Sequence, residues 1–365
     1  MTPAPPVALV HDYLTQRGGA ERVVLTLADA YPDAVVHTSL YDPAGTFPEF
    51  ARHDVRPLPI DRVALLRRHH RLALPLLAPS FGRLVVDAEV TLCSSSGWAH
   101  GARTTGAKVV YCHNPARWLY QSDQYLAGSS PPARLAMAAL RPPLRRWDAR
   151  AAATADRYLV NSRAVRARVA EVYGIDADVV PPPVDIDVDA PRRPVGVEPG
   201  FVLCVSRLMA YKNVDAVVAA FALRPALRLV VVGSGPLADE LAADAPSNVT
   251  FLGRVDDDQL RWLYGSCRGL VAASYEDFGL TPVEAAAFGV PTAALRWGGF
   301  LDTIDPGATG CFFDEPTPAR IADAVDELTR SDWSAPVLTG HAARFAPERF
   351  LARIGAAVDE VRSLR

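Results

Sequence analysis

The stretch FVLCVSRLMAYKNVDAVVAAF, residues 201–221, contains an apolar β-branched run, a loop with two cations and an apolar helical pattern. A buried strand that leads directly into a helix is typical of parallel α/β sheets. Similar runs recur from residue 7 onward: VALV, AVVHT, VTLCS, KVVYCH, RYLVNS and DVVPP, then FVLCVS, RLVVVG, NVTFLG, GLVAAS, VPTAAL and GCFF. We therefore expect an α/β fold with two doubly wound, Rossmann-like domains that face each other across a cleft.

The length of 365 residues is more than one ordinary core needs and suggests two or three domains. Periodicity breaks in PPPVDIDVDAPRRPVGVEPG, residues 181–200, which we interpret as a linker. The predicted domains are residues 1–185 and 198–345. The final segment is expected to form an amphipathic helix over 347–365, with an apolar stripe of Phe350, Leu351, Ile354, Val358, Val361 and Leu364.

The composition indicates a packed, soluble protein, since 50% of residues are hydrophobic and 22% are charged. Lys and Arg number 38 against 41 Asp and Glu, which gives no electrostatic argument for nucleic-acid binding. The five scattered cysteines form no Cys-x-x-Cys pair and argue against structural zinc and for a reducing compartment. No secretory signal is recognisable at the start, so we expect cytoplasmic residence.

Ligand-binding residues are expected in the loops after the strands, because open α/β sheets bind ligands beyond the carboxyl ends of their strands. Arg207 and Lys212 lie in such a loop, where two cations beside free backbone N–H groups suit a diphosphate. Two isolated charges on a solvated loop are the alternative. Gly233 follows a later strand in Gly-Ser-Gly-Pro, which lacks the complete dinucleotide-binding pattern and serves a tight turn equally well.

The stretch YEDFGLTPVEAAAFG, residues 275–289, places Glu276 and Glu284 eight positions apart. Either carboxylate could accept hydrogen bonds from sugar hydroxyls, with the N–H groups of Phe278, Gly279 and Leu280 facing anionic oxygens. Glu284 has a structural alternative, a capping box with Thr281 as the helix cap. No cap explains Glu276.

In the first half, Gly18 and Gly19 precede a helix, where they would admit a phosphate or simply form a flexible turn. His11 and Asp12 end the first strand, as turn-forming residues or as substrate contacts. His113 ends a later strand at the edge where a cleft is expected, and Arg117 follows it as a ligand contact or an exposed charge.

Together these motifs resemble a known family. Glu276 and Glu284 form E-x7-E, Arg207 and Lys212 lie in SRLMAYKN, and GGAER and YCHNP stand in the first half. The combination resembles the retaining glycosyltransferases of the glycogen-synthase-like, mannosyltransferase-containing family with the glycosyltransferase-B fold. In that family the final helix crosses back onto the first domain.

The resemblance implies a role for each matching residue. Arg207 and Lys212 would hold the donor diphosphate, Glu276 the donor sugar, and His113 the transferring sugar; these four are the catalytic candidates. The candidates for donor binding are Gly18, Gly19, Gly233, Val255, Phe278, Gly279, Leu280 and Glu284, with Glu284 on the ribose and the base near Val255. Asp12 and Arg117 are the acceptor-binding candidates.

The implied activity is transfer of a hexosyl group from a nucleoside diphosphate sugar to a hydroxyl of a glycan, a lipid-linked saccharide or a small molecule. Two fixed cations would stabilise the leaving diphosphate, so no metal or other cofactor is expected. Asp256, Asp257 and Asp258 are interpreted as a helix start and not as metal ligands. Pro181-Pro182-Pro183-Val184-Asp185 resembles the bacterial O-antigen mannosyltransferase branch, which favours GDP-mannose over UDP-glucose.

Two other functions suit the same fold: a UDP-sugar 2-epimerase and a non-catalytic nucleotide-sugar binding protein. Residues 61–84 and 134–150 mix cations with apolar residues. Each segment is interpreted either as an ordinary helix with a basic solvated face or as a surface for peripheral contact with the inner face of a membrane.

Overall fold

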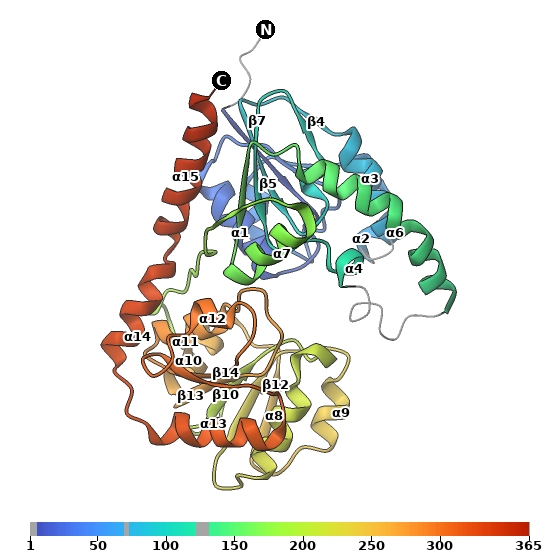
Figure 1. Cartoon of the computed structure of the whole chain (residues 1–365). Helices are drawn as coiled ribbons and strands as arrows, with labels where there is room; N and C mark the ends of the chain where they lie inside the picture. The colour runs from blue at the N-terminus through green and yellow to red at the C-terminus, as the bar shows by residue number, and fades with distance from the viewer. Residues whose placement is uncertain (1–5, 69–72, 122–130, 365) are drawn as a thin grey trace. The chain divides into compact units, whose positions relative to one another are not determined.

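The computed structural model describes residues 6–68, 73–121 and 131–364 (Figure 1). The chain divides into two compact units. Unit 1 contains Met1–Pro183 together with Pro347–Arg365, and unit 2 contains Val184–Ala346. Residues 184–200 of unit 2 contain no helix or strand, as expected of the segment that interrupts the periodicity.

Unit 1 is built on a seven-stranded parallel sheet in the order β3-β2-β1-β5-β7-β8-β9. Its strands are β1 Val7–His11, β2 Val36–Thr38, β3 Val55–Pro57, β5 Val90–Ser95, β7 Ala107–Cys112, β8 Arg157–Val160 and β9 Asp178–Val179. Its helices are α1 Gly19–Ala30, α2 Ala64–Arg68, α3 Leu74–Arg83, α4 Arg117–Tyr120, α6 Pro131–Ala152, α7 Arg163–Tyr173 and α15 Pro347–Ser363. Short 3-10 turns are η1 Pro48–Arg52, η2 Pro59–Arg62 and η4 Ala99–Gly101.

Unit 2 repeats the architecture with a six-stranded parallel sheet in the order β12-β11-β10-β13-β14-β15. The strands are β10 Val202–Val205, β11 Leu229–Val232, β12 Val249–Gly253, β13 Gly269–Ala272, β14 Thr292–Leu295 and β15 Gly310–Phe313. The helices are α8 Val214–Ala222, α9 Ala238–Ala243, α10 Asp257–Ser266, α11 Thr281–Ala287, α12 Phe300–Thr303, α13 Pro318–Arg330 and α14 Ala335–Ala342, with 3-10 turns η5 Ala210–Lys212 and η6 Ala343–Phe345. The predicted α/β class with two Rossmann-like domains is confirmed.

Each sheet is buried on both faces, because apolar clusters lie on either side of it. This explains why the central strands read as unbroken apolar runs and not as an alternating pattern. In each unit the strand order reverses beside the first strand, between β1 and β5 and between β10 and β13. Such a reversal is the topological switch point where doubly wound sheets bind ligands.

The last helix, α15, belongs to unit 1 and packs against α1 and β7. The Phe350 ring meets the Tyr111 ring edge to face at 5.4 Å, and Ile354, Val358 and Val361 are buried. The predicted stripe is therefore correct except at its end. Leu364 lies beyond the helix and is 77% exposed, because the sheet no longer covers that turn.

Three strands were not predicted from the sequence. β3 is short and lies at the edge of its sheet, and β4 Val85–Val86 pairs with β6 Arg103–Thr104 in a separate two-stranded sheet. Short edge strands carry little of the apolar pattern that identifies buried ones.

Of the two basic-apolar segments, 61–84 forms η2, α2 and α3, with residues 69–72 outside the described residues. Leu77 and Phe81 of α3 are fully buried, whereas Leu65 and Leu76 are 57% and 48% exposed. Segment 134–150 lies in α6. In the described part of the chain, no helix combines the length and the apolar character needed to cross a bilayer.

Candidate functional site

In unit 2, the switch point brings two of the sequence candidates into direct contact. Lys212 lies in the loop after β10 and Glu276 in the loop after β13, and their side chains form an ion pair. Lys212 is 6% exposed and Glu276 is 27% exposed. A buried ammonium with a partly exposed carboxylate can contact a ligand without losing its own charge partner.

Tyr211 joins Arg207 to this pair, and sequence reasoning did not select it. The Arg207 guanidinium donates from Nη2 to the Tyr211 hydroxyl at 2.7 Å. The Lys212 ammonium lies 4.9 Å from the centre of the Tyr211 ring, within the range of a cation–π contact. Tyr211 thus holds the two predicted cations in one cluster.

Two further polar side chains fix the loops after β10 and β13. Ser274 Oγ donates to Glu276 Oε1 at 3.3 Å. Asn213 donates from Nδ2 to the Ala273 carbonyl at 2.8 Å, and its backbone has a positive φ of 51°. Asparagine tolerates this left-handed conformation better than most residues. The bond to Ala273 ties the loop that carries Lys212 to the strand that precedes Glu276.

Gly233 allows the loop after β11 to lie close to the loop after β10. Its φ is +133°, and a Cβ there would lie 1.9 Å from the Ser206 carbonyl oxygen. The structure therefore gives Gly233 a packing role that the sequence left open. Gly298 does the same beside the Glu276 carbonyl oxygen, which a Cβ would meet at 2.2 Å.

The structural alternative for Glu284, a capping box with Thr281 as the helix cap, is not formed. Helix α11 begins at Thr281 itself, its cap is Leu280, and no side chain caps it. Glu284 instead accepts a 2.6 Å hydrogen bond at Oε2 from the hydroxyl of Tyr264. Tyr264 is fully buried and stacks on Phe288, so a fixed hydroxyl holds the Glu284 carboxylate.

The turn before α11 places backbone donors next to these carboxylates. Gly279 has a φ of +85°, and Phe278 is buried in the core with its ring against Phe345. In the part of the chain that the structure describes, the backbone N–H groups of Gly279 and Leu280 have no hydrogen-bond acceptor. They are available to an anionic oxygen.

Val255 lies in the loop after β12, half-buried beside the core of unit 2. Arg254 donates from Nε to Ser234 Oγ at 2.9 Å and so links this loop to the one after β11. The next residue, Asp256, caps α10 in a complete capping box with Gln259. The interpretation of Asp256–Asp258 as a helix start is therefore confirmed.

In unit 1, the switch point carries two histidines and a serine. His11 ends β1, Ser94 lies near the end of β5, and His113 follows β7. Ser94 Oγ lies 2.8 Å from His113 Nε2 and 3.2 Å from His11 Nδ1. Asn161 donates to the His113 carbonyl at 2.9 Å, which fixes the backbone at that residue. Ser94 was not selected from the sequence, although its place at a strand end is a usable signal.

Both histidines are neutral at physiological pH. Burial lowers the pKa of His11 to about 4. Burial and then the neighbouring His11 lower the pKa of His113 to about 3. A neutral imidazole has one N–H donor and one acceptor nitrogen. Neither residue therefore brings a charge to this switch point.

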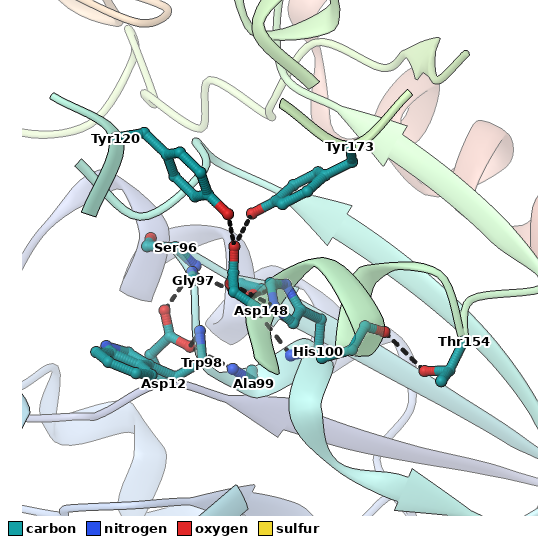
Figure 2. Close-up of polar contacts among 12 residues, drawn as sticks. Asp12, Ser96, Gly97, Trp98, Ala99, His100, Tyr120, Asp148, Thr154 and Tyr173 are labelled. Atoms are coloured by element: carbon teal, nitrogen blue, oxygen red, sulfur yellow. Dashed lines mark hydrogen bonds and ion pairs between the residues drawn. The ribbon is translucent and has the colours of Figure 1, made fainter. Parts of the chain in front are cut away.

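Asp12 does not face an acceptor, so its predicted role needs correction. Its carboxylate is 1% exposed and accepts backbone N–H bonds from Ser96 at 2.6 Å, Trp98 at 3.2 Å and Ala99 at 2.6 Å (Figure 2). Burial raises its pKa to about 6, while the three N–H donors oppose that rise. Asp12 holds the loop after β5.

A second buried carboxylate lies on the other side of η4 (Figure 2). Asp148 of α6 contacts His100 Nε2 at 2.9 Å through Oδ1, and its Oδ2 accepts 2.7 Å bonds from the hydroxyls of Tyr120 and Tyr173. These contacts join η4, α4, α6 and α7. Tyr120 ends α4, which begins at Arg117, so Asp148 anchors the short helix that follows His113.

The remaining candidates of unit 1 lie at helix starts. Gly18 is the N-cap residue of α1 and Gly19 its first residue. A Cβ on Gly18 would lie 2.5 Å from Glu21 Oε2. Arg117 is half-buried, four residues beyond His113. The predicted residues thus belong to both units, and direct contacts join Arg207, Lys212 and Glu276 through Tyr211 in unit 2 and His11 and His113 through Ser94 in unit 1.

Comparisons with known proteins agree with this two-part division. The profile of the family "Glycosyltransferase Family 4" matches residues 17–188, and that of "Glycosyl transferases group 1" matches residues 186–344. The chain is 35% identical over 201 residues to D-inositol 3-phosphate glycosyltransferase of Mycobacterium tuberculosis. That match covers 48% of this chain and 41% of the relative, so it spans less than half of either protein.

Solved structures show the same fold over the whole length. Anabaena HepE in complex with UDP-glucose is 17% identical, with a TM-score of 0.67 over 97% of this chain and 99% of that one. Sucrose-phosphate synthase of Thermosynechococcus elongatus is 19% identical, with a TM-score of 0.70 over 99% and 100%. The two tandem profiles and these folds show that the chain belongs to the glycosyltransferases with the glycosyltransferase-B fold.

Proposed function

We propose that this chain transfers a hexosyl group from a nucleoside diphosphate sugar to a hydroxyl acceptor with retention of the anomeric configuration. The observation that carries the proposal is the cluster of Arg207, Tyr211, Lys212 and Glu276 at the switch point of unit 2. It places two cations and a carboxylate together, which matches a ligand that has both a diphosphate and sugar hydroxyls.

Departure of the diphosphate is the step that this cluster would assist. Cleavage of the glycosyl–phosphate bond leaves negative charge on the diphosphate and positive charge on the sugar carbon. Lys212 and Arg207 would stabilise the first, together with the N–H groups of Gly279 and Leu280, which have no acceptor among the described residues. Glu276 would accept hydrogen bonds from sugar hydroxyls and Glu284 from the ribose. This arrangement needs no metal ion.

In unit 1, His113 would contact the transferring sugar as a neutral imidazole. Gly18 and Gly19, at the start of α1, would border the phosphate, and Arg117 would contact the acceptor. Mannose is the favoured hexose and glucose the next, because residues 181–185 resemble the mannosyltransferase branch. HepE supports a nucleotide sugar as the ligand class through its bound UDP-glucose.

The test is incubation of the purified protein with GDP-mannose and with UDP-glucose, followed by measurement of nucleoside diphosphate release and product anomericity. Release that rises with added sugar acceptors supports the proposal. Conversion of the donor to its 2-epimer would instead identify an epimerase, and tight binding without turnover a binding protein. Lys212→Met tests the site. Arg330→Met is its control, since Arg330 is 78% exposed on α13.

We also propose peripheral contact with an anionic membrane through α2 and the start of α3. Val63, Leu65 and Leu76 are exposed apolar residues, and the basic residues Arg62 and Arg67 belong to the same stretch of sequence. Co-sedimentation with vesicles containing anionic lipid tests the contact, and Leu65→Ser with Leu76→Ser should reduce it. Equal binding by the double variant would contradict the proposal.

A further inference from the structure

Ser94 occupies the middle of the switch point in unit 1. Strand β5 lies between β1 and β7, and its residue Ser94 is in register with His11 on one side and with Tyr111 on the other. Since His113 is two residues after Tyr111, all these side chains belong to the same face of the sheet. Ser94 is 2% exposed, so its hydroxyl is shielded from water and must pair within this group.

The proton of His11 is fixed by the backbone. His11 Nδ1 lies 3.0 Å from the carbonyl oxygen of Ser94. A carbonyl oxygen only accepts hydrogen bonds, so Nδ1 of His11 must carry the proton. The same N–H also reaches the Ser94 hydroxyl oxygen at 3.2 Å. Ser94 Oγ is therefore an acceptor toward His11.

The hydroxyl proton of Ser94 is then left for His113. His113 Nε2 lies 2.8 Å away, and in the described residues no other acceptor is near this hydroxyl. Were Nε2 protonated, two N–H groups would point at Oγ and the buried serine proton would have no acceptor. That arrangement is unfavourable because an unmade buried hydrogen bond costs free energy.

We propose that Ser94 is a positioning residue that fixes His113 as the tautomer with its proton on Nδ1. Nδ1 has no hydrogen-bond partner within the described residues, and His113 is partly exposed. The imidazole is thereby a hydrogen-bond donor toward the ligand, matched to a hydroxyl or ring oxygen of the transferring hexosyl group. The role in transfer rests on the proposed function, whereas the tautomer does not.

The first test is independent of activity. Two-bond ¹⁵N–¹H correlation spectra of histidine-labelled protein at pH 7 distinguish the two neutral tautomers. We expect both His11 and His113 to be protonated at Nδ1. In Ser94→Ala, His11 should keep this tautomer because its backbone acceptor remains, and His113 should populate both. A wild-type His113 protonated at Nε2, or an unchanged His113 in Ser94→Ala, would overturn the inference.

The second test is kinetic. Ser94→Ala should lower kcat by about tenfold with a smaller change in the KM for the donor, since a misdirected imidazole binds but orients poorly. Ser94→Thr retains the hydroxyl and should recover most of the activity. Thr91→Ala is the matched control, because it removes another buried hydroxyl of β5, which is bonded to Thr104 at 2.7 Å.

Loss of activity in Thr91→Ala equal to that in Ser94→Ala would show a purely structural effect and would contradict the assignment. The two tests distinguish failure of the proposed function from failure of the Ser94 assignment. If the wild-type protein transfers no sugar but shows the expected tautomer, the proposed function fails and the assignment of Ser94 stands. The wild-type spectrum requires no variant, so it decides the tautomer even if Ser94→Ala does not fold.

Discussion

The two units have the same sheet topology around the switch point but use it differently. Unit 2 places Lys212 and Glu276 there as an ion pair with a partly exposed carboxylate. Unit 1 places neutral His11 and His113 there and buries Asp12 and Asp148 in internal hydrogen bonds. A charged ligand group is therefore better served by unit 2, and a neutral hydroxyl by unit 1. One fold thus places chemically distinct side chains at its two switch points.

The largest expected effect lies in the buried carboxylate of unit 1. Asp148→Ala removes the acceptor of His100, Tyr120 and Tyr173 together. Loss of a buried partner of this kind costs about 3–5 kcal/mol, so we expect a destabilisation of that size in denaturant titrations. Tyr173→Phe removes a single donor and should cost about 1 kcal/mol. A loss below that of Tyr173→Phe would show that Asp148 does not anchor unit 1.

The neutral state of His11 predicts a dependence of stability on pH. Its pKa is about 4 in the folded protein and 6.5 when exposed, so the unfolded chain binds more protons between these values. Stability should therefore fall as the pH is lowered from 6.5 to 4, by about 3 kcal/mol from this residue.

Asp12 titrates in the opposite sense, because burial raises its pKa to about 6 and protonation then favours the folded state. The measurement is therefore the difference between wild type and His11→Asn in thermal unfolding across this pH range. Parallel pH profiles of the two proteins would contradict the neutral, buried assignment of His11.

The charged cluster of unit 2 should matter chiefly for turnover. Lys212→Met keeps the length of the side chain and removes its charge, and we expect donor cleavage to fall by about a hundredfold. Retained turnover in a folded Lys212→Met protein would show that the cluster is not part of the active site. The contrast between a charged site in unit 2 and a neutral one in unit 1 would then have no role in the reaction.

The smallest expected effect concerns the carboxylate held by Tyr264. Glu284→Gln retains an oxygen that can accept the Tyr264 hydroxyl and loses the charge. We expect an unchanged melting temperature and nucleoside diphosphate binding weaker by about fivefold, or 1 kcal/mol, by calorimetry. A lower melting temperature with unaltered affinity would assign Glu284 to structure alone.

The sequence predicted the central strands because burial on both faces leaves long apolar runs. It missed β3, β4 and β6, whose pairing depends on tertiary position more than on pattern. It also offered a cap at Thr281 as an alternative for Glu284, because the residue types there match a capping box that the structure does not form. Only the path of the chain before the helix distinguishes a cap from a first helical residue.

Among the site residues, Lys212 and Glu276 are predictable because a charge beyond a buried strand stands out in an apolar context. Tyr211, Ser94 and Tyr264 act through one hydroxyl each and carry no such contrast. Asp12, in contrast, was selected from the sequence although its carboxylate is bonded within the protein. Its position suggested a ligand contact, but three backbone N–H groups already occupy its carboxylate.

The position of α15 at the end of the chain has a consequence for folding during synthesis on the ribosome. Its Phe350 completes the core beside Tyr111, yet the ribosome makes it only after all of Val184–Ala346. At about 5–20 residues per second, this delay lasts on the order of ten seconds or more. During that time the nascent chain exposes the apolar surface that α15 later covers. Unit 2 can thus finish folding before unit 1, although it is encoded later.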